Sequence, residues 1–171
     1  MANKLIIFYS RNGENHYDGG LKVLETGNTH VVADLIAEAV DADLFQVDTA
    51  KPYAADYRTC CQEAVAEWKG GARPEVKAYP ESVDGYDVIF VGYPIWCGTM
   101  PMCLYTVLEK LDLTGKKILP FCTHEGSGLS NSVAELEKIC TGAQIGNAFA
   151  VKGCKIHENT QEILNWAQEN I

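Results

Sequence analysis

The chain has 171 residues, of which 47% are hydrophobic and 22% charged, and its formal net charge is -9. This length and balance fit one domain with its own core and exclude a disordered or fibrous chain. The acidic balance argues against nucleic acid as a partner, because phosphates need a basic surface. It favours partner proteins with basic docking surfaces, and the alternative is that the negative charge only keeps the protein soluble.

Two features bear on the cellular compartment. No apolar stretch approaches the roughly 20 residues of a membrane span, and the apolar run 5–9 is too short for a signal peptide. The seven cysteines include no CxxC pair and no metal-ligand spacing, so reduced thiols are expected. Cys122 and Cys140 are expected to be buried, whereas Cys97 lies where reactivity matters. We therefore expect a cytoplasmic monomer or weak dimer without membrane contact.

Strands and helices are expected to alternate along the chain. Apolar runs rich in β-forming residues predict strands at 5–9, 44–47, 88–93, 118–122 and 148–151. Helical periodicity predicts helices at 29–40, 54–68, 101–111, 130–139 and 159–166, with Asn28 capping the first. This alternation predicts an α/β fold of three layers, in which helices cover both faces of a doubly wound, five-stranded parallel sheet.

Two stretches interrupt the alternation. Residues 12–25 separate the first strand from its helix, and residues 70–85 form a connection containing Gly and Pro before the third strand. Both are expected to be surface excursions of a single domain that covers 1–171. His16, Tyr17 and Asp18 would suit a lid over a site, but a plain surface loop is favoured.

The loop between the first strand and its helix has the composition of an anion site. In an open parallel sheet, ligands bind at the carboxyl ends of the strands, where the strand order reverses. A phosphate there would suit the hydroxyls, the amide, the Gly turn and the N–H groups of a helix start. The alternative is that these residues only cap the helix and form the turn. The candidate residues are Ser10, Arg11, Thr26, Gly27, Asn28 and Thr29.

The loops after the third and fourth strands suit a flat ring. Trp96 offers an aromatic face, and Gly98 lets the main chain approach a ligand closely. The candidates after the third strand are Tyr93, Pro94, Ile95, Trp96, Cys97 and Gly98, and those after the fourth are Thr123, His124, Glu125, Gly126 and Gly128. For the loop after the third strand, the alternative is an ordinary strand-to-helix connection that binds no ligand. Acid-base catalysis is the alternative for His124 and Glu125, but no recognisable nucleophile motif accompanies them.

These loops together resemble those of a known family. Tyr-Ser followed by Thr-Gly-Asn-Thr at a helix start resembles the phosphate loop of flavodoxins, and Tyr-Pro-Ile-Trp before Gly and Met-Pro resembles their isoalloxazine loop. The resemblance implies strand order 2-1-3-4-5 and non-covalently bound FMN held by the residues named above, with no catalytic side chain and no metal. It implies a low-potential, one-electron carrier between redox partners. The insertion 12–25 departs from the family loop, which is normally continuous.

Two other functions and three other folds are the alternatives to this resemblance. An NAD(P)H-dependent FMN reductase acting on quinones or similar acceptors would use the same cofactor. A scaffold without flavin would be expected to lose the phosphate-loop hydroxyls, which are present. A Rossmann GxGxxG motif, a P-loop motif and the acidic cluster of a receiver domain are all missing from the expected places.

Overall fold

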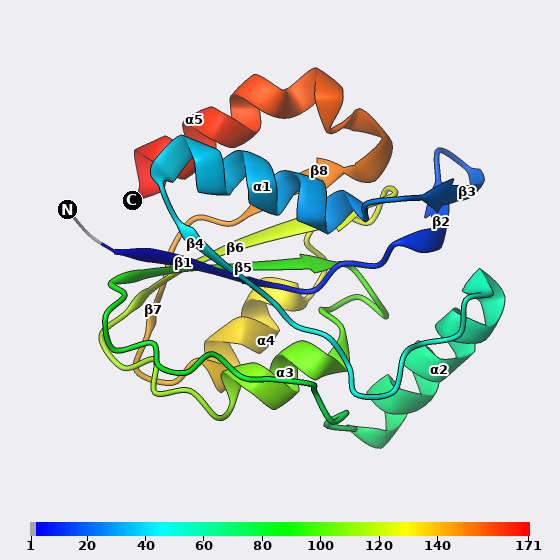
Figure 1. Cartoon of the computed structure of the whole chain (residues 1–171), viewed down its shortest axis with the longest axis horizontal. Coiled ribbons are helices and arrows are strands. Elements are labelled where there is room, and N and C mark those ends of the chain that lie inside the picture. Colours follow the sequence, from blue (N-terminus) through cyan, green and yellow to red (C-terminus); the bar gives the residue numbers. More distant parts are fainter. Residues whose placement is uncertain (1–2) are drawn as a thin grey trace.

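A computed structural model describes residues 3–171, and its centre is a parallel sheet (Figure 1). The strands are β1 (Lys4–Phe8), β4 (Asp43–Gln46), β5 (Val88–Pro94), β6 (Lys117–His124), β7 (Gln144–Ile145) and β8 (Phe149–Lys152). They lie in the order β4-β1-β5-β6, and the short strands β7 and β8 both pair with the free edge of β6. The first four strands of the sheet therefore lie in the predicted order 2-1-3-4. The short strands β7 and β8 share the predicted fifth position.

Helices cover both faces of this sheet (Figure 1). Helices α1 (Asn28–Val40) and α5 (Thr160–Asn170) pack together on one face, and α3 (Met102–Leu108) and α4 (Ser132–Ile139) lie on the other. Helix α2 (Tyr57–Gly70) stands at the side, and the 3-10 turns η1 (Gly153–Lys155) and η2 (His157–Asn159) lead into α5. The predicted three-layer α/β fold is confirmed. Within residues 3–171, no helix has the length and apolar character needed to cross a membrane.

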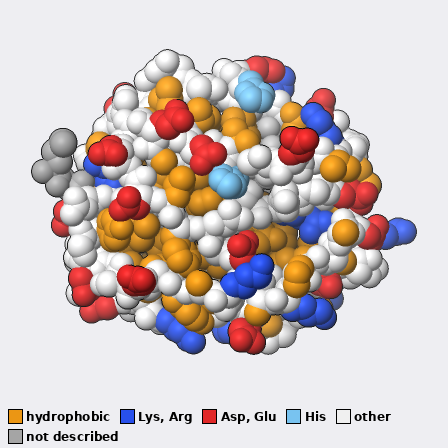
Figure 2. All heavy atoms as spheres, in the orientation of Figure 1, with side chains coloured by type: hydrophobic (Ala, Val, Ile, Leu, Met, Phe, Trp, Pro, Cys, Tyr) orange, Lys and Arg blue, Asp and Glu red, His pale blue; other side chains and the backbone are white. Residues whose placement is uncertain are grey.

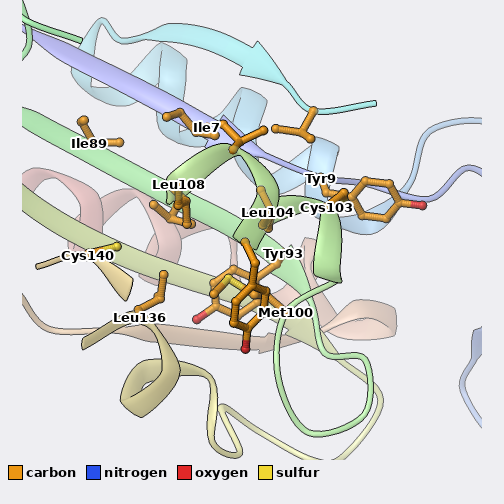
Figure 3. Close-up of a cluster of buried hydrophobic side chains, with 14 of the residues drawn as sticks. Ile7, Tyr9, Ile89, Tyr93, Met100, Cys103, Leu104, Leu108, Leu136 and Cys140 are labelled. Carbon is orange, nitrogen blue, oxygen red and sulfur yellow. The ribbon is translucent and has the colours of Figure 1, made fainter. Parts of the chain in front are cut away.

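The central strands are apolar throughout because both of their faces are buried. Alternate residues of β5 point to opposite sides. Ile89 and Tyr93 join the cluster under α3 and α4, while Val88 and Phe90 join the cluster under α1 and α5. Figure 3 shows part of the first cluster, where Leu104 of α3 lies among the buried side chains. Unbroken burial of this kind produces the apolar runs seen in the sequence.

The insertion folds into an antiparallel hairpin that the sequence analysis did not predict. Its strands are β2 (Gly13–Tyr17) and β3 (Gly20–Leu24). Asp18 and Gly19 turn the chain with φ values of 50° and 80°, the positive pair typical of a type I′ turn. Because Gly13 pairs with Leu24, the chain leaves and returns at one place.

Several predicted helix starts shift in the structure. The prediction that Asn28 caps α1 is wrong, because Gly27 is the N-cap and Asn28 is the first helical residue. Helix α2 starts at Tyr57, where the Asp56 carboxylate caps it by accepting a 2.7 Å hydrogen bond from the Thr59 N–H. A side-chain cap can fix a helix start more sharply than periodicity does.

The close packing of β5 on β6 gives a test of the fold. A Cβ atom at Gly92 would overlap the ring of Phe121, whereas a Cβ at Gly85 would meet open space. We expect Gly92→Ala to lower the free energy of unfolding by about 1–3 kcal/mol, as overpacking of a core does. Gly85→Ala is the matched control in urea titrations, and equal stability of the two variants would contradict this packing.

Candidate functional site

Three cavities lie at the edge of the sheet where β1 and its neighbours end. The helix-end cavity, of about 110 Å³, is bounded by Asn28, Thr29 and Thr123. The tryptophan cavity, of about 280 Å³, lies between Trp96 and α2. The outer cavity, of about 900 Å³, lies towards β4. The first two cavities share the residues Arg11, Tyr57, Ile95 and Trp96, and so they form one groove.

The start of α1 provides backbone donors at one end of this groove. Gly27 packs so tightly on Ser10 and the carbonyl of Arg11 that a side chain there would overlap both. The Ser10 hydroxyl accepts a 3.1 Å hydrogen bond from the N–H of His30, and so caps the helix from the end of β1. The N–H groups of Asn28 and Thr29, in the first turn, have no carbonyl partner within the helix. With the positive end of the helix dipole, they make this cavity suitable for an anion.

Two threonine hydroxyls hold this helix start against the sheet. Thr29 and Thr123 are 1% and 3% exposed, and their hydroxyl oxygens lie 2.8 Å apart in a hydrogen bond. Since each hydroxyl is engaged by the other, they join the first turn of α1 to the end of β6. The position of the backbone donors therefore depends on this pair.

Arg11 braces the groove by bonding to main chain. Its Nε donates to the carbonyl of Glu14 at 2.9 Å, and an Nη donates to the carbonyls of Ala54 and Ala55 at 3.0 Å each. The Glu14 carboxylate in turn accepts a 2.8 Å hydrogen bond from the N–H of Tyr57. The hairpin and the start of α2 are thus joined through Arg11, whose guanidinium lines both parts of the groove.

The other end of the groove is apolar and aromatic. Trp96 lies edge-to-face with Tyr9 and Tyr53, with ring centroids 5.2 Å and 5.1 Å away. The turn that follows is closed by hydrogen bonds in both directions between Trp96 and Thr99, of 2.8 Å and 3.0 Å. Cys97 occupies this turn at a φ of 53°, a left-handed conformation uncommon for a residue with a side chain. These contacts hold the indole in one orientation.

The loop after β6 is tied to two other segments. The carboxylate of Glu125 accepts hydrogen bonds from the N–H of Asp18 at the hairpin tip, at 3.0 Å, and from the N–H of Cys154 in η1, at 3.2 Å. His124 Nδ1 accepts a 2.9 Å hydrogen bond from the N–H of Gly126. Burial lowers the pKa of His124, which favours the neutral ring. Glu125 and His124 therefore organise the loop and line the helix-end cavity.

The structure brings most of the predicted site residues together. Those that line the groove are Arg11, Asn28, Thr29, Pro94, Ile95, Trp96, Cys97, Thr123, His124 and Glu125. Ser10, Thr26 and Gly27 line the adjoining outer cavity. Gly98, Gly126 and Gly128 line none of the three cavities.

Tyr93 belongs to the core. It is 0% exposed, and its hydroxyl donates a 2.9 Å hydrogen bond to Ser132. Its side chain is therefore not available to a ligand in the groove.

Sequence reasoning missed the groove residues supplied by the insertion and by α2. The hairpin contributes Asn15 and His16, and α2 contributes Tyr57, Cys60 and Cys61. The insertion lies at the surface, as predicted, but it also forms a wall of the site. The Asp18-Gly19 pair is the signal that would have revealed the hairpin.

A double-mutant cycle tests the threonine pair. Thr29→Val leaves the buried hydroxyl of Thr123 without its partner, so we expect a loss of about 1–3 kcal/mol in unfolding free energy. Adding Thr123→Val should recover part of this loss, because no orphaned hydroxyl remains. Strictly additive effects in urea titrations would show that the two side chains do not interact.

Comparison with known proteins identifies a protein family for this chain. The family model described as Flavodoxin matches residues 23–170. None of the curated proteins matches. Among solved structures, a candidate flavoprotein from Bacteroides uniformis is 27% identical, with a TM-score of 0.78 and 98% of each chain covered. One from Bacteroides eggerthii is 26% identical, with a TM-score of 0.77 and coverage of 99% of this chain and 98% of the other.

A third solved structure supports the fold alone. It is a flavoprotein from Lactobacillus acidophilus in complex with FMN, and it is 20% identical to this chain. Its TM-score is 0.66, and the match covers 92% of this chain and 98% of the other.

Proposed function

Because the chain belongs to the flavodoxin family, we propose that it is a low-potential carrier that passes one electron at a time between redox partners. FMN is the cofactor that family membership brings, and we assign it to the groove as a non-covalent ligand. The observation that carries this assignment is a single groove with an anion-binding helix start at one end and an apolar, aromatic wall at the other. FMN has one part to match each end, because it carries a negatively charged phosphate ester and a flat aromatic ring.

The residues at each end fit the two parts of the cofactor. The N–H groups of Asn28 and Thr29 would hold the phosphate, and Ser10 with Gly27 would fix the shape of the loop around it. Trp96 would flank the ring, and the main chain of Cys97 would lie along the ring edge.

Bound FMN supplies the electron chemistry, since it can exchange electrons singly or in pairs. The side chains of this protein have to bind, orient and shield it. Tyr9 and Tyr53 keep the indole of Trp96 in place, and Arg11 maintains the groove wall next to α2. No side chain has to act as an acid, base or nucleophile for such a role.

The charge of the chain supports weak, transient docking to other proteins. With a net charge of -9, it would be drawn to basic partner surfaces, which raises encounter rates more than affinity. Figure 2 shows acidic side chains scattered over one face of the molecule. We further propose a cytoplasmic location and a monomer or weak dimer. All seven cysteines are free, which suits a reducing compartment.

Stepwise reduction tests the electron-carrier role. We would load the protein with FMN under anaerobic conditions, offer NADPH and then dithionite, and follow the visible spectrum. The carrier role predicts no reaction with NADPH and reduction by dithionite in two separate one-electron stages. Rapid two-electron reduction by NADPH would instead identify an FMN reductase for quinones or similar acceptors. Failure to hold FMN would contradict both roles and leave a scaffold.

The phosphate end can be tested separately with Asn28→Asp. This change puts a carboxylate beside the proposed phosphate, so we expect FMN to bind at least about tenfold more weakly, or about 1.4 kcal/mol. Riboflavin, which lacks the phosphate, should bind equally well before and after the change. Asn165→Asp adds the same charge on the exposed surface of α5 and serves as the control. Equal weakening of FMN and riboflavin would place the phosphate elsewhere.

A further inference from the structure

The hairpin leaves one edge of its two-stranded sheet open. In the described part of the chain, β2 and β3 pair only with each other. Strand β2 faces the body of the protein, where its Glu14 carbonyl accepts the hydrogen bond from Arg11 and its His16 ring stacks on Tyr57. Strand β3 is exposed over four of its five residues, and the hairpin lies at the rim of the molecule (Figure 1). An open strand edge is a template on which another strand can pair.

The turn of the hairpin determines which backbone groups of β3 point outward. Because the turn has two residues, the flanking pair Tyr17 and Gly20 exchanges hydrogen bonds, and bonded pairs alternate with non-bonded pairs along the ladder. Leu21 and Val23 belong to the non-bonded pairs, so their N–H and C=O groups point away from β2. Within residues 3–171, no other backbone group bonds to them. These two residues therefore carry the free hydrogen-bonding groups of the edge.

The side chains of the same two residues are apolar and exposed. Leu21 is 59% exposed and Val23 is 73% exposed. They are two positions apart, and so they lie on one face of the strand. Lys22, between them, points to the opposite face, where its ammonium lies 4.4 Å from the centre of the Tyr17 ring. Strand β3 thus presents free backbone groups and two apolar side chains together.

We propose that two copies of this chain pair through β3, which forms an antiparallel sheet with the order β2-β3-β3-β2. The outward groups of Leu21 and Val23 lie symmetrically about Lys22, so a twofold axis at Lys22 satisfies all of them. Leu21 of each copy then bonds to Val23 of the other, and the four apolar side chains meet on one face. A twofold axis at Val23 would place Leu21 opposite Glu25, and one at Leu21 would place Val23 opposite Gly19.

The hairpin is held in place for this pairing at both of its ends. At its base, Arg11 bonds to the main chain of Ala54 and Ala55. At its tip, the N–H of Asp18 donates to the carboxylate of Glu125. Because the strand is already ordered in the single chain, pairing costs little further conformational entropy.

The dimer is a weak one for two electrostatic reasons. Each copy has a net charge of -9, so the two copies repel each other as a whole. The axis also places Lys22 opposite the same residue of the second copy, and like charges directly opposite weaken a sheet. An interface of five residues on each side is also smaller than a standard stable interface. Pairing is therefore reversible and depends on protein and salt concentration.

Pairing would also bring a residue of the second copy to the site. Val23 lines the outer cavity, which adjoins the groove. In the proposed register, Leu21 of the second copy lies directly opposite Val23 and on the same face of the sheet. It therefore lies at the rim of the outer cavity and narrows the opening of that cavity.

Sedimentation velocity of the full chain, with and without added FMN, tests self-association. From about 10 µM to about 1 mM protein, we expect a shift towards the dimer. The shift should grow between about 0.05 M and about 0.5 M salt, because salt screens the repulsion between the copies. A chain that stays monomeric over the whole range would overturn the proposal. Dimerisation without FMN would support it whatever the outcome for the carrier role.

Charge substitutions on the edge test the location of the interface. Leu21→Lys and Val23→Lys should each weaken self-association by at least about tenfold, since each change enters a twofold interface twice. Leu44→Lys is the matched control, because Leu44 is 44% exposed on β4, an edge strand of the main sheet. It should leave self-association unchanged. A dimer that survives both hairpin substitutions would overturn the proposal.

Lys22 gives a test of the register that does not depend on those variants. Opposite residues of a non-bonded antiparallel pair have Cα atoms about 4.5 Å apart, which is within reach of a disulfide. Mild oxidation should therefore join two Lys22→Cys chains through residue 22, as seen in a peptide digest, and Leu44→Cys should give no equivalent link. Lys22→Thr should tighten the dimer by about two- to fivefold. Absence of the 22–22 link, or a weaker dimer with Lys22→Thr, would overturn the proposed pairing.

Discussion

The antiparallel pairing of β2 with β3 is the constraint on which the site depends. An insertion between the first strand and its helix would ordinarily separate Ser10 from Gly27, and the anion site with it. Because Gly13 pairs with Leu24, the inserted chain returns to its starting point, and Gly27 packs directly on Ser10. The interrupted loop is thereby rebuilt, and the Ser10 hydroxyl can cap α1 across the gap.

The same hairpin also connects the walls of the groove. Arg11, at its base, bonds to the main chain before α2, and Asp18, at its tip, donates to Glu125 after β6. Helix α2 stands at the side in Figure 1 and contacts both the hairpin strand β2 and helix α3. The hairpin and α3 therefore both hold α2 beside Trp96 and bound the tryptophan cavity.

The two ends of the groove rely on different physics. At the helix start, an anion would be bound by backbone donors that folding leaves without partners, and a buried hydroxyl pair sets their position. At the tryptophan cavity, it comes from apolar burial and from an indole held by two tyrosines. A ligand with one charged end and one flat, apolar end uses both, whereas a simple anion or a simple aromatic uses only half of the groove.

The sequence by itself determined the α/β class, the main strands and the three loops of the site, because buried parallel strands read as unbroken apolar runs and ligand loops follow their carboxyl ends. It also predicted burial of Cys122 and Cys140, which the structure confirms. Only the tertiary structure decided that Tyr93 belongs to the core, that Ser10 rather than Asn28 caps α1, and that α2 supplies a groove wall. These outcomes depend on contacts between segments far apart in the chain, which local periodicity and residue preference do not encode.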